Sequence, residues 1–412
     1  MNAFICAVPL HYYFFKSIYN HLNDAIFVIP PVADSPFMKT LGGGLTGGAQ
    51  FNYIYSFLAS QNVKVADYGT VTAENFVRYI NDNIKNVVCP HMFTGIERLK
   101  NKRIIKLVYG IPSDTRSLRY EYLYLMDLIL TFGQESVNRI STKKIPSVPI
   151  GNPLFDDWYN DKVDSKSCDL IKKRLDLGKE TILYLPTWGG DSSLDNYIEE
   201  IASLAHEYNV IIKLHHCTFS GEMNRLHQCM SYPDLIVLGD YFDPLPLYKV
   251  SNKIITDGMS GATFDAIMLG KTVLTIGSSV KNYGLNENKK SAANIFSFLD
   301  NVPLIENPKE LKNALKQIKN KTLEIRPSIK EQIYFRCDGL AGERAAKAIL
   351  DIERYPSSPM LEKFNRGING VADSNQKNII LGAKNIFLNY FYPTKNKKTP
   401  LFSKISQWLS TR

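Results

Sequence analysis

The stretch that most constrains the fold of this chain is residues 253–276, whose pattern predicts a strand, a loop, a helix and a second strand. Two apolar runs flank the glycine-bracketed loop, residues 257–261, and Ser260 or Thr263 can cap the helix that follows. Gly270 stands where a helix C-terminal glycine is expected. Such a unit directs backbone N–H groups and a helix N-terminus at one spot, which favours anion binding. An ordinary βαβ turn without a ligand has the same pattern, so other segments must decide between the two.

Short apolar runs alternate with helical patterns along most of the chain, and this alternation indicates parallel sheets. The expected strands are residues 3–8, 25–29, 63–66, 86–89, 104–108, 128–131, 182–185, 210–214, 235–238, 254–255 and 273–276. The expected helices include residues 11–22, 72–84, 194–208, 311–318 and 341–352.

The chain has 412 residues, which is too long for one ordinary core, and proline and glycine punctuate residues 148–153. We therefore expect an α/β protein of the GT-B architecture, in which two Rossmann-like, doubly wound domains face a cleft. The first domain spans residues 1–150 and the second spans residues 151–352. Residues 353–412 form a linker and a basic, amphipathic, helical tail.

Polar and glycine residues follow four consecutive expected strands of the second domain. Ligands of open α/β sheets bind at the carboxyl ends of strands, so these residues are expected to share one rim. They are Thr187, Trp188, Gly189, Lys213, His215, His216, Asp240, Ser260, Gly261 and Thr263. In the first domain, His11, His91 and Tyr109 follow expected strands in the same way. One such strand end means little, but four in order are hard to explain by packing alone.

The charge and the cysteines exclude several classes of protein. A formal net charge of +9 favours an anionic substrate, lipid surface or polymer, and no nucleic-acid-binding module is recognisable. The 6 cysteines are scattered without a CxxC pair, which indicates reduced thiols in a cytosolic protein rather than a zinc site or a disulfide framework. We expect neither a signal peptide nor a membrane-spanning segment.

Five segments carry a resemblance to the CDP-glycerol glycerophosphotransferase family of teichoic acid and capsule synthesis. Residues 151–156, 184–188, 213–216 and 338–344 resemble its G-x-P-R-x-D, Y-x-P-T-W, basic-x-H-P and D-G-x-A-x-x-R segments. Residues 256–265 resemble its T-D-x-S-S-x-x-F-D unit through Thr256, Asp257, Ser260, Phe264 and Asp265. The resemblance covers roughly residues 100–350.

The resemblance implies a bacterial transferase that moves glycerol phosphate, or a related polyol phosphate, from a CDP-linked donor to a hydroxyl of a cell-surface glycan or lipid-linked acceptor. It places the enzyme in the cytoplasm, on the inner face of the cell membrane. The first domain would then hold the acceptor and the second the nucleotide donor. We expect CDP-glycerol as the donor substrate, no cofactor besides it, and no tightly bound metal.

The donor site is expected to combine Thr187, Trp188, Gly189, Lys213, His215, Asp240, Asp257, Ser260, Gly261 and Thr263. The helix N-terminus supplies N–H donors, and Lys213 or His215 supplies positive charge. Trp188 is an apolar wall for the nucleotide or simply packs between the domains. Successive side chains of a strand point to opposite faces, so only one of His215 and His216 is expected in the site, and we favour His215.

The acceptor side departs from the family pattern, because the family's W-H-G segment, whose histidine is its expected base, is replaced here by Val108-Tyr109-Gly110. The loop at residues 257–261 also has one extra residue, and Gly261 stands in place of a serine. His11, His91 and Tyr109 therefore compete as the general base. A tyrosine would need a strongly lowered pKa, so the two imidazoles are chemically easier.

Two other functions stay open. Asp257 and Asp265, eight residues apart, are also typical of GT-B glycosyltransferases that use a nucleotide sugar for capsule, LPS or glycan synthesis. The replacement at Tyr109 is compatible with a non-catalytic, glycan-binding homologue. In the tail, residues 377–412, basic residues alternate with aromatic and aliphatic ones, which favours an anionic membrane surface as partner; a tail packed on the first domain is the alternative.

Overall fold

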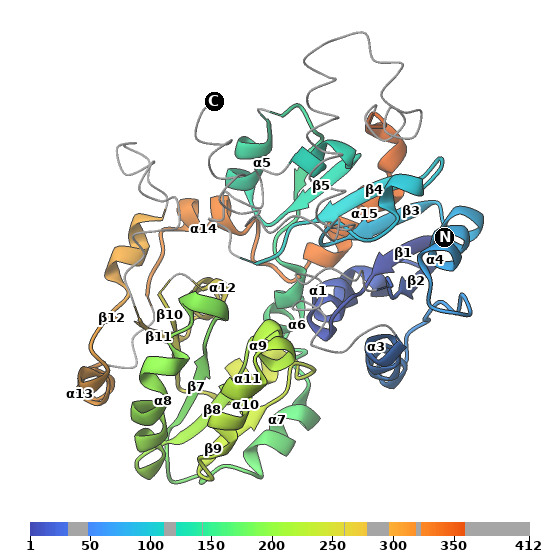
Figure 1. The fold of residues 1–412 in the computed structure, drawn as a ribbon. Coiled ribbons are helices and arrows are strands. Elements are labelled where there is room, and N and C mark those ends of the chain that lie inside the picture. The colour runs from blue at the N-terminus through green and yellow to red at the C-terminus, as the bar shows by residue number, and fades with distance from the viewer. Residues whose placement is uncertain are drawn as a thin grey trace, which may run out of the picture.

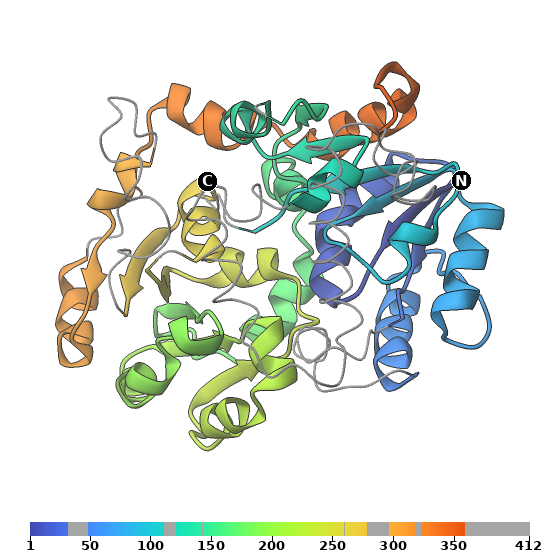
Figure 2. The ribbon, with the colours of Figure 1, turned by 45° about the horizontal axis from the view of Figure 1, so that its top comes forward.

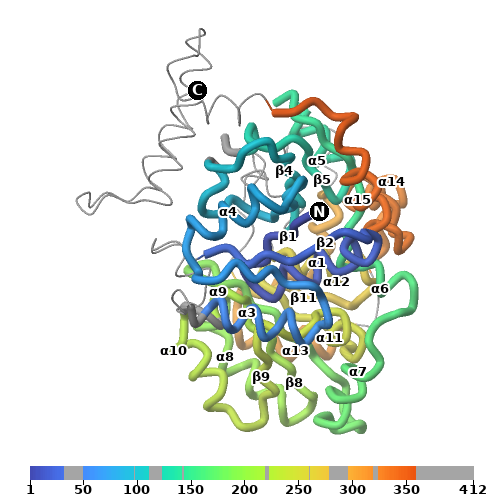
Figure 3. The backbone as a smooth tube through the Cα atoms, turned by 90° about the vertical axis from the view of Figure 1, so that its right-hand side faces the viewer, coloured from blue at the N-terminus to red at the C-terminus, as the bar shows by residue number. Residues whose placement is uncertain are grey.

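The structure is a computed structural model, and it describes residues 1–31, 48–110, 121–141, 143–258, 260–277, 296–318 and 323–358. Within them the chain forms two six-stranded sheets. All strand pairs in both sheets are parallel. The two sheets occupy separate halves of the molecule (Figures 1 and 3). No helix among the described residues is long and apolar enough to span a membrane.

The N-terminal sheet has the strand order β2-β1-β3-β4-β5-β6. Its strands are β1 (Asn2–Ile5), β2 (Ala25–Val28), β3 (Asn86–Cys89), β4 (Arg103–Leu107), β5 (Leu128–Thr131) and β6 (Ser147–Pro149). Its helices are α1 (Pro9–Asn20), α3 (Gly48–Ser60), α4 (Ala73–Asn83) and α5 (Gln134–Ser141). The expected strand at residues 63–66 is wrong: Val65 forms only an isolated bridge to Phe27 at the sheet edge. Strand β6 was not expected, because it is short, lacks an apolar run and ends in a proline.

The C-terminal sheet has the strand order β12-β11-β10-β7-β8-β9. Its strands are β7 (Thr181–Leu185), β8 (Asn209–Lys213), β9 (Leu235–Leu238), β10 (Lys253–Asp257), β11 (Thr272–Ile276) and β12 (Leu304–Ile305). Its helices are α7 (Ser165–Lys172), α8 (Leu194–Ser203), α9 (His216–Gly221), α10 (Met223–Met230), α11 (Pro244–Val250), α12 (Gly261–Met268) and α13 (Leu311–Gln317). This is the doubly wound order of a Rossmann sheet. The chain adds β8 and β9 on one side of β7, then returns and adds β10, β11 and β12 on the other side.

The unit at residues 253–276 folds as predicted, into β10, α12 and β11. Ser260 is the residue that caps α12: its backbone is extended and its Oγ accepts a hydrogen bond from Ala262 N at 3.1 Å. Gly270 has φ of 71°, the left-handed conformation expected after a helix end. The strands on both sides of α12 are fully buried, so the loop between them is held at the carboxyl edge of the sheet.

The two halves are joined by α6 (Asp156–Tyr159), α14 (Pro327–Ile333) and α15 (Ala341–Leu350). Helix α15 packs against α1, and α14 packs against α5, so this late segment crosses back to the N-terminal half (Figure 2). The buried carboxylate of Asp156 accepts hydrogen bonds from Ala341 N at 3.0 Å and Gly342 N at 2.7 Å. It also accepts one from Ser17 Oγ on α1 at 2.6 Å.

Arg344 completes this junction. Its guanidinium pairs with both carboxylate oxygens of Asp338 at 2.9 Å and donates to Ile150 O at 2.8 Å. Residues 151–156 and 338–344, two of the segments that carry the family resemblance, therefore build the connection between the halves. The limits of the expected domains stay a prediction, and residues 359–412, most of the predicted tail, lie outside the described residues.

Candidate functional site

Asp257 lies at the end of β10 and holds together the carboxyl edge of the C-terminal sheet, which is called the C-terminal rim below. Its buried carboxylate accepts hydrogen bonds from Thr187 N at 2.7 Å and from Ser193 N at 3.1 Å, and a third from Ser193 Oγ. Burial raises the pKa of Asp257 to about 6, and these bonds oppose the rise. Asp257 thus ties the segment after β7 to the end of β10.

Trp188 lies in a segment that is hydrogen-bonded to residues at the start of α10. Its indole ring stacks with the imidazole of His215, with centroids 6.0 Å apart and planes inclined by 20°. Gly189 N donates to Glu222 Oε1 at 3.1 Å, and Arg225 Nη1 donates to Gly189 O at 2.9 Å. The indole is therefore a fixed wall at the carboxyl edge of β7.

His215 caps α9 with its own ring. Nδ1 of His215 accepts a hydrogen bond from Cys217 N at 3.2 Å, so the neutral ring carries its proton on Nε2. Burial lowers the pKa of His215 well below its ordinary value. Near neutral pH this histidine therefore offers an N–H donor, and its predicted role in the donor site stays a prediction.

Lys213 supplies a cation to this rim. Burial lowers the pKa of its ammonium, and the carboxylates of Asp240 and Asp243 oppose that shift. Asp240 in turn accepts a hydrogen bond from Tyr53 on α3, which brings an N-terminal helix to the C-terminal rim.

The residues at the start of α12 differ in their access to the cleft. Ser260 and Gly261 are half-buried at the positive end of the helix. Thr263 has no exposed surface, and its Oγ1 lies 2.6 Å from Oγ1 of Thr256. The hydroxyl of Thr263 thus connects α12 to β10, and the contact of Thr263 with the donor stays a prediction.

His215, His216 and Cys217 form a group whose potential ligand atoms all lie within 4.8 Å of one another. Burial raises the pKa of the Cys217 thiol to about 12, which disfavours the thiolate that metals prefer. The prediction that no metal is bound stays a prediction.

The candidate bases of the N-terminal rim form one cluster. The centroid of the His11 ring lies 5.5 Å from those of His91 and Tyr109, and the latter two are 4.7 Å apart. The hydroxyl of Tyr109 is in direct hydrogen-bond contact with Nε2 of His91. The three residues follow β1, β3 and β4, which are neighbours in this sheet, and the strand order reverses between β1 and β3.

The ring of His11 is oriented by a backbone amide, as the ring of His215 is. Ala7 N donates to its Nδ1 at 3.2 Å, and its buried Nε2 has no hydrogen-bond partner among the described residues. Burial lowers the pKa of His11 to about 3, so the ring is neutral. Each rim thus presents a neutral imidazole whose tautomer is set by a backbone amide.

Lys106, on β4, belongs to this cluster and was not predicted. Its buried ammonium donates to Pro90 O, and burial lowers its pKa to about 8. Its charge acts on both His11 and His91. The signal was present in the sequence as a lysine within an otherwise apolar strand, residues 104–108.

The two rims face each other closely enough to interact. His216, on the C-terminal side, lies close enough to add to the lowering of the pKa values of His11 and His91, which burial mainly causes. The hydroxyl of Tyr13 donates to Tyr241 O across the same seam. The candidate donor residues and the candidate bases therefore meet in one place between the sheets.

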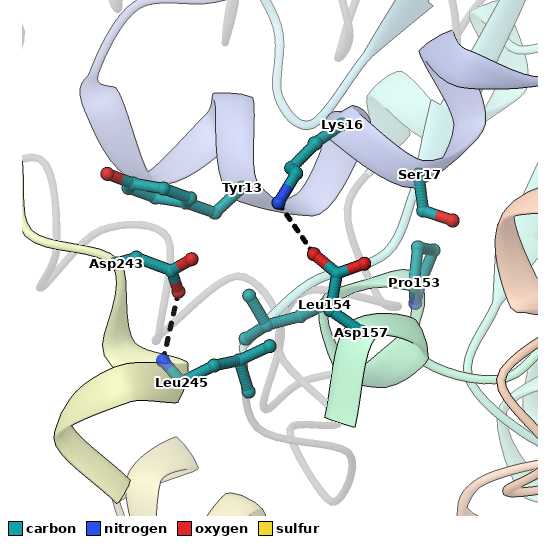
Figure 4. Close-up of a pocket in the computed structure, with 8 residues that line it drawn as sticks. All are labelled: Tyr13, Lys16, Ser17, Pro153, Leu154, Asp157, Asp243 and Leu245. Carbon is teal, nitrogen blue, oxygen red and sulfur yellow. Dashed lines mark hydrogen bonds and ion pairs between the residues drawn. The ribbon is translucent and has the colours of Figure 1, made fainter. Parts of the chain in front are cut away.

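A small pocket continues this seam (Figure 4). Lys16 Nζ and Asp157 Oδ2 form an ion pair at 2.6 Å across it, and Asp243 Oδ1 accepts from Leu245 N at 2.9 Å. Its other lining residues are Tyr13, Ser17, Pro153 and Leu154. Burial raises the pKa of Asp243 to about 6.

Two doubly wound sheets on either side of a seam are the GT-B architecture. The family model described as CDP-Glycerol:Poly(glycerophosphate) glycerophosphotransferase matches residues 115–351, and the chain belongs to this family. It is therefore an enzyme that transfers glycerophosphate, as the resemblance predicted.

Solved structures with the same fold include a variant of the wall teichoic acid polymerase TagF soaked with CDPG. That chain is 16% identical with a TM-score of 0.54, and the match covers 86% of this chain and 89% of that one. Another is UDP-GlcNAc 2-epimerase from Neisseria meningitidis, bound to UDP-GlcNAc. It is 13% identical with a TM-score of 0.50, and the match covers 85% of this chain and 100% of that one. The comparison with curated proteins finds no match. The predicted fold class is thus confirmed, whereas the roles of individual site residues stay predictions.

Proposed function

We propose that this enzyme transfers the glycerol phosphate group of CDP-glycerol to a hydroxyl of a cell-surface glycan or lipid-linked acceptor, in the cleft between its two sheets. Membership of the glycerophosphotransferase family supports the donor class. The observation that carries the proposal is the pairing of two built rims. His215, Lys213 and the start of α12 lie on one side and the His11–His91–Tyr109 cluster lies on the other. Hydrogen bonds from Tyr13 to Tyr241 and from Tyr53 to Asp240 join the two sides.

The C-terminal rim suits the donor diphosphate. A diphosphate carries negative charge that grows on the leaving group as CMP departs, and phosphoryl transfer depends mainly on positioning and on neutralising this charge. Nε2–H of His215, the ammonium of Lys213 and the N-terminus of α12 are the donors and charges available for it. The clamped indole of Trp188 would form an apolar wall for the nucleotide.

The N-terminal rim suits the acceptor. The new bond forms between the acceptor oxygen and the phosphorus of glycerol phosphate, while the bond from that phosphorus to CMP breaks. The acceptor hydroxyl must lose its proton during this step, and the N-terminal cluster holds imidazoles that are neutral near pH 7.

The test is release of the nucleotide. Purified enzyme is incubated with CDP-glycerol, UDP-sugars and CMP-sugars in parallel, each with and without a glycerophosphate-primed acceptor. Acceptor-dependent release of CMP from CDP-glycerol alone is expected. Release of UDP from a UDP-sugar, or of CMP only from CMP-sugars, would instead establish a nucleotide-sugar glycosyltransferase, and binding without turnover would establish a non-catalytic homologue.

The tail supports a further part of the proposal, peripheral attachment to an anionic membrane. Residues 377–412 contain seven basic and no acidic residues, interleaved with aromatic and aliphatic ones. Each cation near an anionic leaflet contributes on the order of 1 kcal/mol, and apolar side chains enter the headgroup boundary. A chain that ends at Ser358 should keep activity on a soluble acceptor and lose sedimentation with anionic vesicles; equal vesicle binding by both chains would contradict the attachment.

A further inference from the structure

Lys213 is the last residue of β8, and its half-buried side chain forms no ion pair and no hydrogen bond with any residue that the structure describes. Two carboxylates act on its charge, those of Asp240 and Asp243 in the segment after β9. Strands β8 and β9 are paired so that Lys213 lies opposite Leu238, two residues before Asp240. Since charges that leave bulk water are usually paired, one of these carboxylates would be the expected partner of Lys213.

Both carboxylates are engaged by other groups. Oδ1 of Asp243 accepts a hydrogen bond from Leu245 N at 2.9 Å and caps α11. Oδ1 of Asp240, which is 6% exposed, accepts one from the hydroxyl of Tyr53. Burial, and then the carboxylate of Asp240, raise the pKa of Tyr53, so the phenol keeps its proton and is the donor of this bond. Because Tyr53 is on α3, a side chain of the N-terminal half holds a carboxylate beside the cation of the C-terminal rim.

Lys213 lies on the same side of the C-terminal sheet as α12. Successive side chains of a strand alternate between the two faces, so Lys213 shares a face with Ile211, two residues earlier. Ile211 belongs to the core cluster that contains Phe264 of α12, whereas Ile212 belongs to the cluster that contains the buried side chains of α8. The free ammonium and the N-terminus of α12 are thus on one face, and both attract the same anion.

We propose that Tyr53 is a positioning residue of the donor site: it holds the carboxylate of Asp240 and so leaves the ammonium of Lys213 free for the donor diphosphate. The N-terminal half thus completes the donor site of the C-terminal half. Without the hydroxyl of Tyr53, the carboxylate of Asp240 can pair with Lys213. The donor then binds only the fraction of molecules in which this pair is open, so its apparent affinity falls. The inference rests on the proposed function for the identity of the donor.

The first test is the affinity of the full chain for CDP-glycerol, measured by isothermal titration calorimetry without an acceptor. Tyr53→Phe removes the hydroxyl and keeps the ring, so we expect the Kd to rise about 10-fold, the lower end of what a hydrogen bond to a charged group contributes. Tyr13→Phe is the matched control. It removes another hydroxyl that crosses the seam, but the acceptor of that hydroxyl is the uncharged backbone carbonyl of Tyr241, so the Kd should stay near that of the wild type.

Removing the charge of Asp240 separates positioning from packing. Asp240→Asn keeps the shape of the side chain, but its neutral amide cannot form an ion pair with Lys213. Adding Asp240→Asn to Tyr53→Phe should therefore restore most of the lost affinity. In a Lys213→Met chain no ammonium is left to be paired, so Tyr53→Phe should cost nothing further there. If Tyr53 only packs α3 against the seam, its substitution would weaken binding equally in the wild-type, Asp240→Asn and Lys213→Met chains.

The outcomes distinguish this role from the proposed function. Thermal unfolding establishes that each variant is folded. A folded Tyr53→Phe chain with the Kd of the wild type, or an equal loss in all three backgrounds, would overturn the positioning role. If the wild type binds a UDP-sugar or a CMP-sugar instead of CDP-glycerol, the proposed function fails, and the same variants test the positioning role with that donor, since each of these donors carries phosphate. A wild type that binds none of them would overturn both.

Discussion

Replacing Asp156 by alanine tests the connection between the two halves of the molecule. The carboxylate is 4% exposed and receives three hydrogen bonds, from Ala341 N, Gly342 N and Ser17 Oγ. Asp156→Ala leaves the two amides at the start of α15 without this acceptor, and an unsatisfied buried amide costs about 1–3 kcal/mol. The burial that raises the pKa of Asp156 is relieved at the same time, so we expect a net loss of about 2–4 kcal/mol.

The assay is urea unfolding followed by tryptophan fluorescence, since Trp158 lies on the same short helix as Asp156. Asp156→Asn keeps one acceptor oxygen and should lose about half as much. The control is Asp169→Ala, whose carboxylate is 69% exposed and 4.0 Å from Lys172, an ion pair expected to contribute under about 0.5 kcal/mol. Equal midpoints for Asp156→Ala and Asp169→Ala would refute the assignment of Asp156 as the link between α1, α6 and α15.

Three further outcomes are expected. Gly342→Ala should lower the unfolding midpoint, because a Cβ at this position would lie 2.1 Å from Ser17 Oγ, and such overpacking costs about 1–3 kcal/mol. Adding Ser17→Gly should restore part of the loss. An unchanged midpoint in Gly342→Ala would contradict this close approach. Asp265→Asn should stabilise the protein at pH 8. Burial raises the pKa of Asp265 to about 7, so between about pH 4 and pH 7 the folded wild type binds more protons than the unfolded wild type. The free energy of unfolding of the wild type therefore falls by about 1.4 kcal/mol for each unit that the pH rises in this interval. Thermal unfolding should show the gap between variant and wild type widening over that interval, whereas a constant gap would exclude this titration. His215→Ala should lower kcat with CDP-glycerol about 10²–10³-fold, the usual cost of one donor to a developing charge, while the exposed His227→Ala should not; full activity of a folded His215→Ala enzyme would remove His215 from the site.

Local patterns were sufficient for most of the fold. The limits of β3, β5 and β9 agree with the predicted runs, and the unit at residues 253–276 folds as expected with Ser260 as its cap. These features depend on apolar periodicity and on turn chemistry, which are properties of neighbouring residues. Elements without such a signal were missed, as with the proline-ended β6. Residues 63–66 form only the bridge between Val65 and Phe27 at the edge of the sheet.

The chemistry of the site was only partly determined by the sequence. The strand-end pattern identified His11, His91, Tyr109 and His215 as candidates, because carboxyl ends of parallel strands share an edge. It did not show that the hydroxyl of Tyr109 contacts Nε2 of His91, that Lys106 lies beside them, or that the hydroxyl of Thr263 faces inward. Contacts of this kind join residues on different strands, and the order of the strands in the sheet decides which of them meet.

Protonation states belong to the tertiary structure as well. The sequence supplies histidines and a lysine with ordinary pKa values, and burial between the two sheets makes the imidazoles neutral and lowers the pKa of the lysine. The same holds for α15, whose sequence predicts a helix but not the surface that the helix covers. Its place on α1 follows from Asp156, Ser17 and Gly342, three residues far apart in the chain that the fold brings within hydrogen-bonding distance or steric contact.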